Sequence, residues 1–205
     1  MGERCEIVDE KVIFNWSPIP GIVAVVDSNK MGEDAIFYAA RICRGQKLFA
    51  MEDEKKKLLF KFLLTRKHLK PFDFASLTYY IKAPIFVERQ LRVYRTATIL
   101  ERSLRACEPF EGNDETLPYI KEYNELISIG EPKEIARRVL PLSAFTSFFY
   151  QMNVRNLLHL FDERLTKETQ LETRLFAQLM WKEFEQKFPL IANIYKQQNE
   201  DLLFF

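Results

Sequence analysis

Arginines and their polar neighbours occur at two places in this chain where a plain solubilising surface does not call for them. The first group lies between residues 89 and 105 and is made up of Gln90, Arg95, Glu101, Ser103 and Arg105. On a helix, Glu101 and Arg105 are four residues apart and face each other. The simplest interpretation of this group is a surface ion-pair ladder, worth about 0.3–0.5 kcal/mol per pair.

The second group places Asn153 and Arg155 inside an apolar stretch, with His159 and Arg164 following. A buried polar group without a partner costs about 1–3 kcal/mol. Arginine is favoured where planar oxyanions are bound through two parallel hydrogen bonds. The residues alone leave two interpretations open, a buried structural hydrogen-bond network and a site for such an oxyanion.

Metal chemistry and nucleophilic catalysis are not predicted. Neither His68 nor His159 has a Cys, Asp or Glu partner at zinc spacing, and no Ser-His-Asp or Cys-His arrangement is present. Cys5, Cys43 and Cys107 are too widely spaced for a disulfide framework, which favours a reducing cytoplasm. Because no phosphate loop or dinucleotide fingerprint occurs, any bound nucleotide or flavin would be held without a Rossmann-type turn.

The overall charge balance restricts the class of partner. The chain has 30 Lys and Arg residues and 29 Asp and Glu residues, for a net charge of +1. No global field therefore attracts nucleic acid or an anionic membrane, and any bound anion must be held by local arginines. The apolar stretches carry charges every few residues, so neither a transmembrane helix nor a membrane partner is expected.

The elements that position these residues follow from their patterning. Residues 12–27 and 74–83 predict strands, because both are rich in β-branched or aromatic side chains. Pro84 predicts the start of a helix reaching about Arg105, which would gather its five arginines into a band on one side. Further helices are predicted over 33–43, 51–66, 116–129, 144–163 and 167–187, from 132, and beyond 189. We expect one α+β domain over residues 1–205, mostly helical with a small β-sheet.

Residues 82–90 read Lys-Ala-Pro-Ile-Phe-Val-Glu-Arg-Gln. This run resembles the one that precedes the signature of the flavin-dependent thymidylate synthases, which is Arg-His-Arg, seven residues and Ser. Here the triplet is Val93-Tyr94-Arg95, and Ser103 follows at the family spacing.

Other blocks extend the resemblance in order over about residues 35 to 195. Residues 39–43 resemble the family's Ala-Ala-Arg-x-Ser, with Cys43 in place of the serine, and residues 68–73 resemble its His-Glu-Thr-Pro-Phe-Glu. Residues 134–142 and 153–157 resemble two further family stretches. The last matching positions are Arg164, Gln170 and Glu172.

The resemblance implies a homotetramer that uses FAD to carry a hydride and methylenetetrahydrofolate to carry one carbon to the pyrimidine of dUMP, with NADPH or another reductant. It implies a nucleotide site made of Gln90, Glu101, Ser103, Arg105, Arg164 and, from a neighbouring subunit, Arg137. It implies catalytic roles for Arg164 and Ser103 and a cytoplasmic location. Its expected flavin contacts are His68, Arg95, Asn153, Arg155 and His159.

Several residues depart from the family pattern. Val93 and Tyr94 replace an arginine and a histidine, and His159 stands where the family has asparagine. Val93 offers no hydrogen bond, and Tyr94 cannot become cationic. Leu104 replaces a glycine, so the segment after Arg95 is expected to stay helical.

Two functional hypotheses follow from these observations. The retained polar residues favour an enzyme of the thymidylate synthase type. The departures favour a non-catalytic or repurposed relative that keeps the fold and binds nucleotide or flavin as a regulatory or partner-binding subunit. Seven large apolar residues between 145 and 161 exceed one stripe of a monomer helix, so part of them is expected in a subunit interface.

Overall fold

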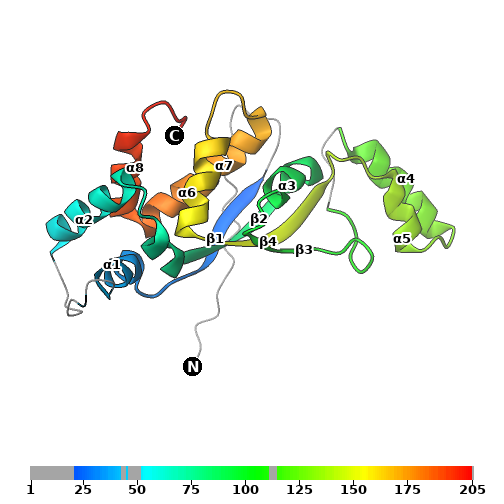
Figure 1. Cartoon of the computed structure of the whole chain (residues 1–205). Coiled ribbons are helices and arrows are strands. Elements are labelled where there is room, and N and C mark those ends of the chain that lie inside the picture. The colour runs from blue at the N-terminus through cyan, green and yellow to red at the C-terminus, as the bar shows by residue number, and fades with distance from the viewer. Residues whose placement is uncertain (1–20, 43–44, 46–51, 111–114, 205) are drawn as a thin grey trace.

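A computed structural model describes residues 21–42, 45, 52–110 and 115–204 (Figure 1). Its centre is an antiparallel sheet with the strand order β1-β2-β4-β3. The strands are β1 (Ile22–Ser28), β2 (Ser76–Pro84), β3 (Thr98–Glu101) and β4 (Phe145–Asn153). β2 and β4 pair along their full length, from Ser76 opposite Asn153 to Pro84 opposite Phe145.

The helices lie at the two ends of this sheet and along one of its faces. They are α1 (Glu33–Ile42), α2 (Asp53–Thr65), α3 (Ile85–Arg92), α4 (Leu117–Ser128), α5 (Lys133–Ala136), α6 (Val154–Arg164), α7 (Leu171–Lys187) and α8 (Pro189–Gln198), with short 3-10 helices η1 (Lys70–Phe74) and η2 (Arg137–Val139). Figure 1 shows α4 and α5 as an arm at one end, far from α1, α2 and α8 at the other. None of the helices in these ranges is long and apolar enough to cross a membrane.

Strand β2 shows why one face of the sheet forms the core. Its side chains alternate between the two faces, so Leu77, Tyr79 and Ile81 are fully buried, whereas Thr78 and Tyr80 are only partly buried. The buried face packs on an aromatic cluster made of Phe161, Trp181, Phe184, Phe188 and Tyr195. The predicted α+β class, mostly helical with a small sheet, is confirmed.

The predicted helix from Pro84 to Arg105 is wrong beyond its second turn. Helix α3 ends at Arg92, and the chain then turns and forms β3 against β4. Pairing with β4 overrides the helical pattern, because Ile99 is partly buried against the core once it is in the strand. The band of arginines on one helix therefore does not exist, and the segment around Leu104 is a turn rather than a helix.

The predicted helix over 144–163 is also wrong in its first half, where β4 precedes α6. Aromatic and β-branched residues suit a strand that is buried on the core side. Six of the seven apolar residues used to infer an interface are buried within this single chain, and only Phe149 is exposed. The six buried residues are therefore not available to a subunit interface, and the homotetramer stays a prediction.

The remaining predicted elements agree with the structure within a few residues. The strand at 74–83 corresponds to β2, and the helices at 33–43, 51–66, 116–129 and 167–187 correspond to α1, α2, α4 and α7. Gly130 follows α4 with a φ of 94°, as expected for a glycine that ends a helix. The apolar run at 12–14 lies outside the described residues.

Glu33, at the start of α1, contacts the start of α8 and allows a test of how the stability of the fold depends on pH. Its Oε1 accepts a hydrogen bond from the backbone N–H of Ile191 (2.8 Å), at the start of α8. Burial raises the pKa of Glu33 to about 7, although this hydrogen bond and Lys56 oppose the rise. A carboxyl whose pKa is raised in the folded state favours folding below its unfolded pKa and loses that contribution as the pH rises through 7.

Between pH 5 and pH 8, the wild-type free energy of unfolding is therefore expected to fall by about 1–2 kcal/mol relative to that of Glu33→Gln. Glutamine keeps an acceptor for Ile191 but does not titrate. Urea denaturation at both pH values measures the difference, with Glu54→Gln, an exposed carboxyl of α2, as the matched control. If the free energy of unfolding of wild type differs from that of Glu33→Gln by the same amount at pH 5 and pH 8, Glu33 does not have this role.

Candidate functional site

Helix α6 positions four of the residues that the sequence singled out. Asn153 caps its N-terminus, and the Asn153 side chain accepts a hydrogen bond from the backbone N–H of Asn156 (2.9 Å). Arg155 and His159 lie one turn apart on the exposed side, and Arg164 closes the last turn. The helix therefore carries Arg155 and His159 along its solvent side while its other side enters the core.

Asp73 joins the start of α6 to η1. Its Oδ1 accepts a hydrogen bond from Asn153 Nδ2 (3.3 Å), and its Oδ2 lies 2.9 Å from Lys70 Nζ and 3.7 Å from Arg155 Nη1. The side chain of Asp73 is 20% exposed, and that of Arg155 is 49% exposed. Asn153 thus belongs to a structural hydrogen-bond network, whereas Arg155 keeps much of its guanidinium available to a ligand.

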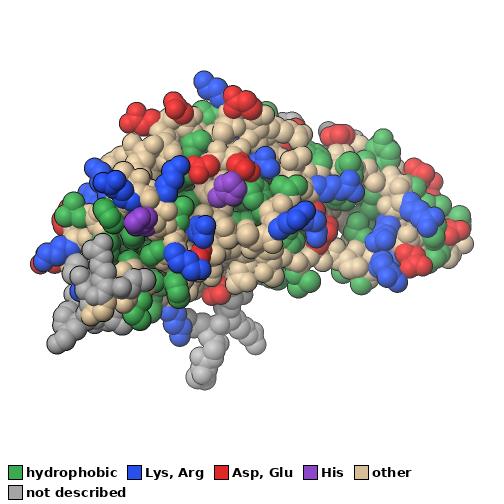
Figure 2. Space-filling model, viewed as in Figure 1, with side chains coloured by type: hydrophobic (Ala, Val, Ile, Leu, Met, Phe, Trp, Pro, Cys, Tyr) green, Lys and Arg blue, Asp and Glu red, His purple; other side chains and the backbone are tan. Residues whose placement is uncertain are grey.

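His68 and Arg95 do not take part in the hydrogen-bond and ion-pair network of Asp73. His68 is exposed, and its ring meets that of Phe62 edge-on at 5.9 Å between centroids. Arg95 is exposed and has no hydrogen bond or ion pair among the described residues, and neighbouring Val93 is 59% exposed. Both histidines of the chain are visible on the face shown in Figure 2, with Lys and Arg side chains around them.

A second cluster forms where the turn after α3 meets the end of α6. The hydroxyl of Tyr94 donates a hydrogen bond to Glu163 Oε2 (2.7 Å), and Glu163 Oε1 lies 3.4 Å from His159 Nε2. The guanidinium carbon of Arg164 lies 5.3 Å from the centroid of the Tyr94 ring. Arg164 Nε is buried and has no hydrogen-bond partner among the described residues.

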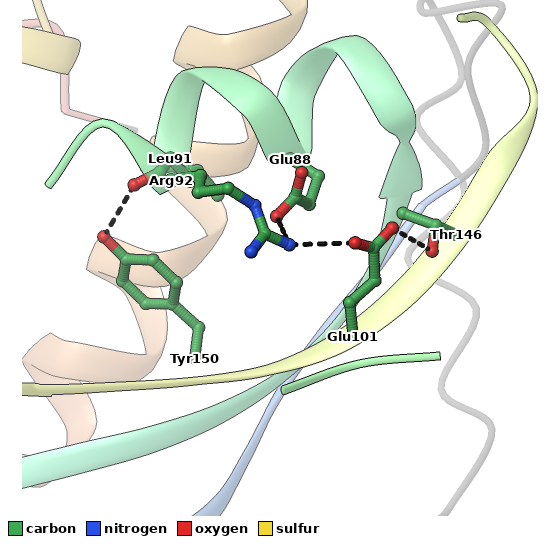
Figure 3. Close-up of polar contacts among 6 residues, drawn as sticks. All are labelled: Glu88, Leu91, Arg92, Glu101, Thr146 and Tyr150. Carbon is green, nitrogen blue, oxygen red and sulfur yellow. Dashed lines mark hydrogen bonds and ion pairs between the residues drawn. The ribbon is translucent and has the colours of Figure 1, made fainter. Parts of the chain in front are cut away.

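Glu101 belongs to a third network, which Figure 3 shows. The Arg92 guanidinium lies between two carboxylates, pairing with buried Glu88 and, at 2.8 Å, with Glu101 Oε2. Glu101 Oε1 accepts a hydrogen bond from Thr146 Oγ1 (2.9 Å). Burial raises the pKa of Glu88, and the hydrogen bond to Glu88 raises that of Arg92. Glu101 thus pairs with Arg92 and not with Arg105, which corrects the predicted ladder.

Ser103 and Arg105 line a pocket of about 400 Å³ between the turn after β3 and helix α5. Arg105 Nη2 lies 3.3 Å from Glu134 Oε2, and Lys133 Nζ lies 3.5 Å from Glu108 Oε1. Two ion pairs therefore connect the segment after β3 to α5, one with its cation on that segment and the other with its cation on α5. The pocket presents two cations and a hydroxyl, the donor types that bind a phosphate.

Gln90 and Arg137 are not brought to these clusters. Gln90 is exposed near the end of α3, and Arg137 is exposed at the start of η2, on the arm that Figure 1 shows projecting from the sheet. Neither side chain has a hydrogen bond or ion pair with another described residue. Within one chain, the expected nucleotide residues are therefore divided among separate places.

Sequence reasoning missed the acceptors that organise these clusters. Asp73 pairs with Lys70. Glu88 pairs with Arg92. Glu163 accepts a hydrogen bond from Tyr94. Glu88 offered a readable signal, because it lies four residues before Arg92 on a helix. Asp73 and Glu163 contact residues 80 and 69 positions away, respectively, and no local pattern predicts such contacts.

Comparison with known proteins places this geometry in context. A family model described as thymidylate synthase complementing protein matches residues 24–190. Over 202 residues the chain is 29% identical to a flavin-dependent thymidylate synthase of Thermus thermophilus, covering 83% of this chain and 73% of the relative. Over 193 residues it is 31% identical to that of Thermotoga neapolitana, covering 82% of this chain and 88% of the relative.

A solved structure has the same fold. The UMP/dUMP methylase PolB from Streptomyces cacaoi, bound with 5-Br dUMP, aligns with a TM-score of 0.76 at 24% identity. The alignment covers 86% of this chain and 95% of the other. At this identity the likeness establishes the arrangement of the sheet and helices.

Proposed function

The chain belongs to the thymidylate synthase complementing protein family, and from that premise we propose that it transfers one carbon from methylenetetrahydrofolate to the pyrimidine of dUMP or a related nucleotide, with FAD as hydride carrier. Relatives named flavin-dependent thymidylate synthase support the reaction. PolB, described as a UMP/dUMP methylase, supports a pyrimidine nucleotide as the substrate.

The observation that carries the proposal is the arrangement of donors along α6. Asn153 caps this helix and is held by Asp73, Arg155 and His159 follow on its exposed side, and Arg164 ends it with a buried Nε that has no partner among the described residues. An unmatched buried donor costs about 1–3 kcal/mol, so a ligand that supplies an acceptor there gains affinity. A purely structural arginine is normally satisfied within the protein.

The chain's own residues would bind and orient the two ligands. Arg155 and His159 fit the polar edge or the phosphates of FAD, which are rich in acceptors, although Val93 leaves the site one cation short of the family pattern. FAD would supply the hydride chemistry when bound. Arg164 would donate to the pyrimidine and stabilise negative charge that develops on the ring.

The nucleotide phosphate would bind in the pocket of Ser103 and Arg105. In the structure Glu134 pairs with Arg105, so a dianionic phosphate must compete with the Glu134 carboxylate for this guanidinium. The pair is exposed on both sides, and such pairs are worth only about 0–1 kcal/mol. A phosphate that also accepts from Ser103 is therefore expected to displace Glu134.

We also propose that sites are completed between subunits of a homotetramer in the cytoplasm. Arg137 supports this idea, because it lies on the projecting arm of α4 and α5 without a partner in the described part of its own chain. NADPH or another reductant would return the flavin to its reduced state.

Absorption spectroscopy of the purified protein tests the proposal, first with added FAD and then with dUMP. A bound-flavin band that dUMP perturbs is the expected result, followed by turnover of dUMP with reduced flavin and methylenetetrahydrofolate. Saturable binding of both ligands without turnover of dUMP or dCMP would instead support the non-catalytic hypothesis. Absence of saturable FAD binding would overturn the flavin assignment.

Replacing Asp73 with asparagine is expected to weaken FAD binding about threefold to tenfold. Asparagine can still accept from Asn153, but it no longer holds Lys70 and Arg155 by charge. Stability should change little, because these ion pairs are partly exposed. FAD titration measures the effect, with Asp201→Asn at an exposed C-terminal position as the control. Unchanged FAD affinity in Asp73→Asn would show that Asp73 does not position these donors.

A further inference from the structure

Tyr94 occupies the position where the related enzymes' triplet has its histidine, and it is the most buried residue of this turn. It is 8% exposed, whereas Val93 beside it is 59% exposed. Its backbone is held at both ends of the turn, because its N–H donates to the carbonyl of Leu91 (3.3 Å) and its carbonyl accepts from Ala97 (3.0 Å). The Tyr94 side chain therefore points inward, towards the end of α6.

The ring of Tyr94 faces the guanidinium of Arg164. The guanidinium carbon lies 5.3 Å from the ring centroid, within the range in which a cation is attracted to an aromatic face. Among the described residues, Arg164 thus lies against a ring and forms no ion pair with an acid. Its Nε has no hydrogen-bond partner among them, so this donor stays available to a ligand.

The hydroxyl of Tyr94 is anchored separately. It donates to Glu163 Oε2 at 2.7 Å, and burial raises the pKa of the phenol, so it stays protonated and keeps donating at neutral pH. The other oxygen of Glu163 lies 3.4 Å from His159 Nε2, and the His159 ring meets the Tyr94 ring edge-on at 6.1 Å. Two departures from the family pattern, Tyr94 and His159, therefore contact each other and share one carboxylate.

We propose that Tyr94 is a positioning residue for Arg164, with Glu163 and His159 holding the phenol so that its ring presents the guanidinium to the pyrimidine. The inference rests on the proposed function, because Arg164 is the residue assigned to the pyrimidine ring there. It gives Tyr94, the central residue of the Val93-Tyr94-Arg95 triplet, a role in positioning Arg164 for the substrate. Arg95 and Arg155 belong to the flavin side and are not part of this unit. His159, which is also assigned to FAD, meets the unit only through Glu163 and the edge of the Tyr94 ring.

The test separates the ring of Tyr94 from its hydroxyl. Tyr94→Phe keeps the ring and removes the bond to Glu163, whereas Tyr94→Leu removes both. The expected dissociation constant for dUMP rises about threefold in Tyr94→Phe and about tenfold or more in Tyr94→Leu. FAD affinity should change less than threefold in both. Tyr119→Phe, an exposed tyrosine on the distant arm, is the matched control and should behave as wild type.

A second measurement does not depend on any ligand. Phenylglyoxal modifies accessible arginines, and peptide mass spectrometry follows each site over time. Arg164 should react several-fold faster in Tyr94→Leu than in wild type and at a nearly unchanged rate in Tyr94→Phe. Arg105 and Arg155 serve as internal references, because neither contacts Tyr94.

The outcomes distinguish this inference from the proposed function. If the wild type binds neither FAD nor dUMP, the proposed function fails, while the modification rates still decide whether Tyr94 holds Arg164. An unchanged Arg164 rate in Tyr94→Leu overturns the inference. So does equal weakening of FAD and dUMP together with a lower melting temperature, because that pattern indicates a general structural role.

Discussion

Replacing Arg164 with lysine is expected to lower turnover of dUMP about 100-fold or more. Losing one preorganised donor at a site of developing charge typically reduces kcat by about 10²–10³-fold. Lysine keeps the positive charge but not the planar donors, and its ammonium group does not lie against the ring of Tyr94 in the same way. The main effect should appear in kcat, because the interaction strengthens as charge develops on the pyrimidine.

The measurement is steady-state turnover with saturating reduced flavin and methylenetetrahydrofolate, together with FAD titration. Arg174→Lys is the matched control, since Arg174 donates to the backbone carbonyls of Thr166 and Lys167 and belongs to no candidate cluster. FAD affinity should stay near wild type in both variants. Turnover within a few-fold of wild type in Arg164→Lys would remove Arg164 from the catalytic assignment.

Replacing Arg92 with methionine is expected to lower the free energy of unfolding by about 2–3 kcal/mol. The change leaves the buried carboxyl of Glu88 without its cation, and breaking a buried pair typically costs about 3–5 kcal/mol. The lower figure applies because Arg92 is itself 48% exposed. Urea denaturation measures the loss, and Arg89→Met, an exposed arginine on the same helix, should change stability by less than about 0.5 kcal/mol.

A double variant tests the physical reason for this loss. Adding Glu88→Gln to Arg92→Met removes the unpaired charge and should restore about half of the lost stability or more. The same variants should weaken dUMP binding, because Glu101 loses its Arg92 partner and keeps only Thr146 (Figure 3). Full stability in Arg92→Met would show that the pair with Glu88 does not hold the end of α3.

Local patterning predicted the elements whose residues agree with their surroundings. Strand β2 was recognisable from its aromatic and β-branched content, and α1, α2, α4 and α7 from their apolar spacing and bounding residues. The collinear blocks also predicted the family, which the match over residues 24–190 bears out. The spacing of motif residues is a property of the sequence, so it can be recognised before the fold is known.

The segments at 93–105 and 145–153 could not be read in this way. A helix is predicted for both, but pairing in the sheet decides otherwise. Thr98–Glu101 of the first segment forms β3 on β4, and the second segment forms β4 on β2. That pairing separates Glu101 from Arg105 and brings Glu101 to Arg92. The nucleotide-binding residues stay a prediction, whereas the expected pairing of Glu101 with Arg105 is wrong.

The sequence by itself thus determined the family, the α+β class and the positions of the retained arginines. Only the tertiary structure decided which carboxylate meets which cation, and that Tyr94, Glu163 and Arg164 form one cluster. The physical reason is the distance along the chain. Spacing within a helix or strand brings near neighbours together, whereas a contact across 69 residues, such as that of Tyr94 with Glu163, exists only once the turn after α3 packs against the end of α6.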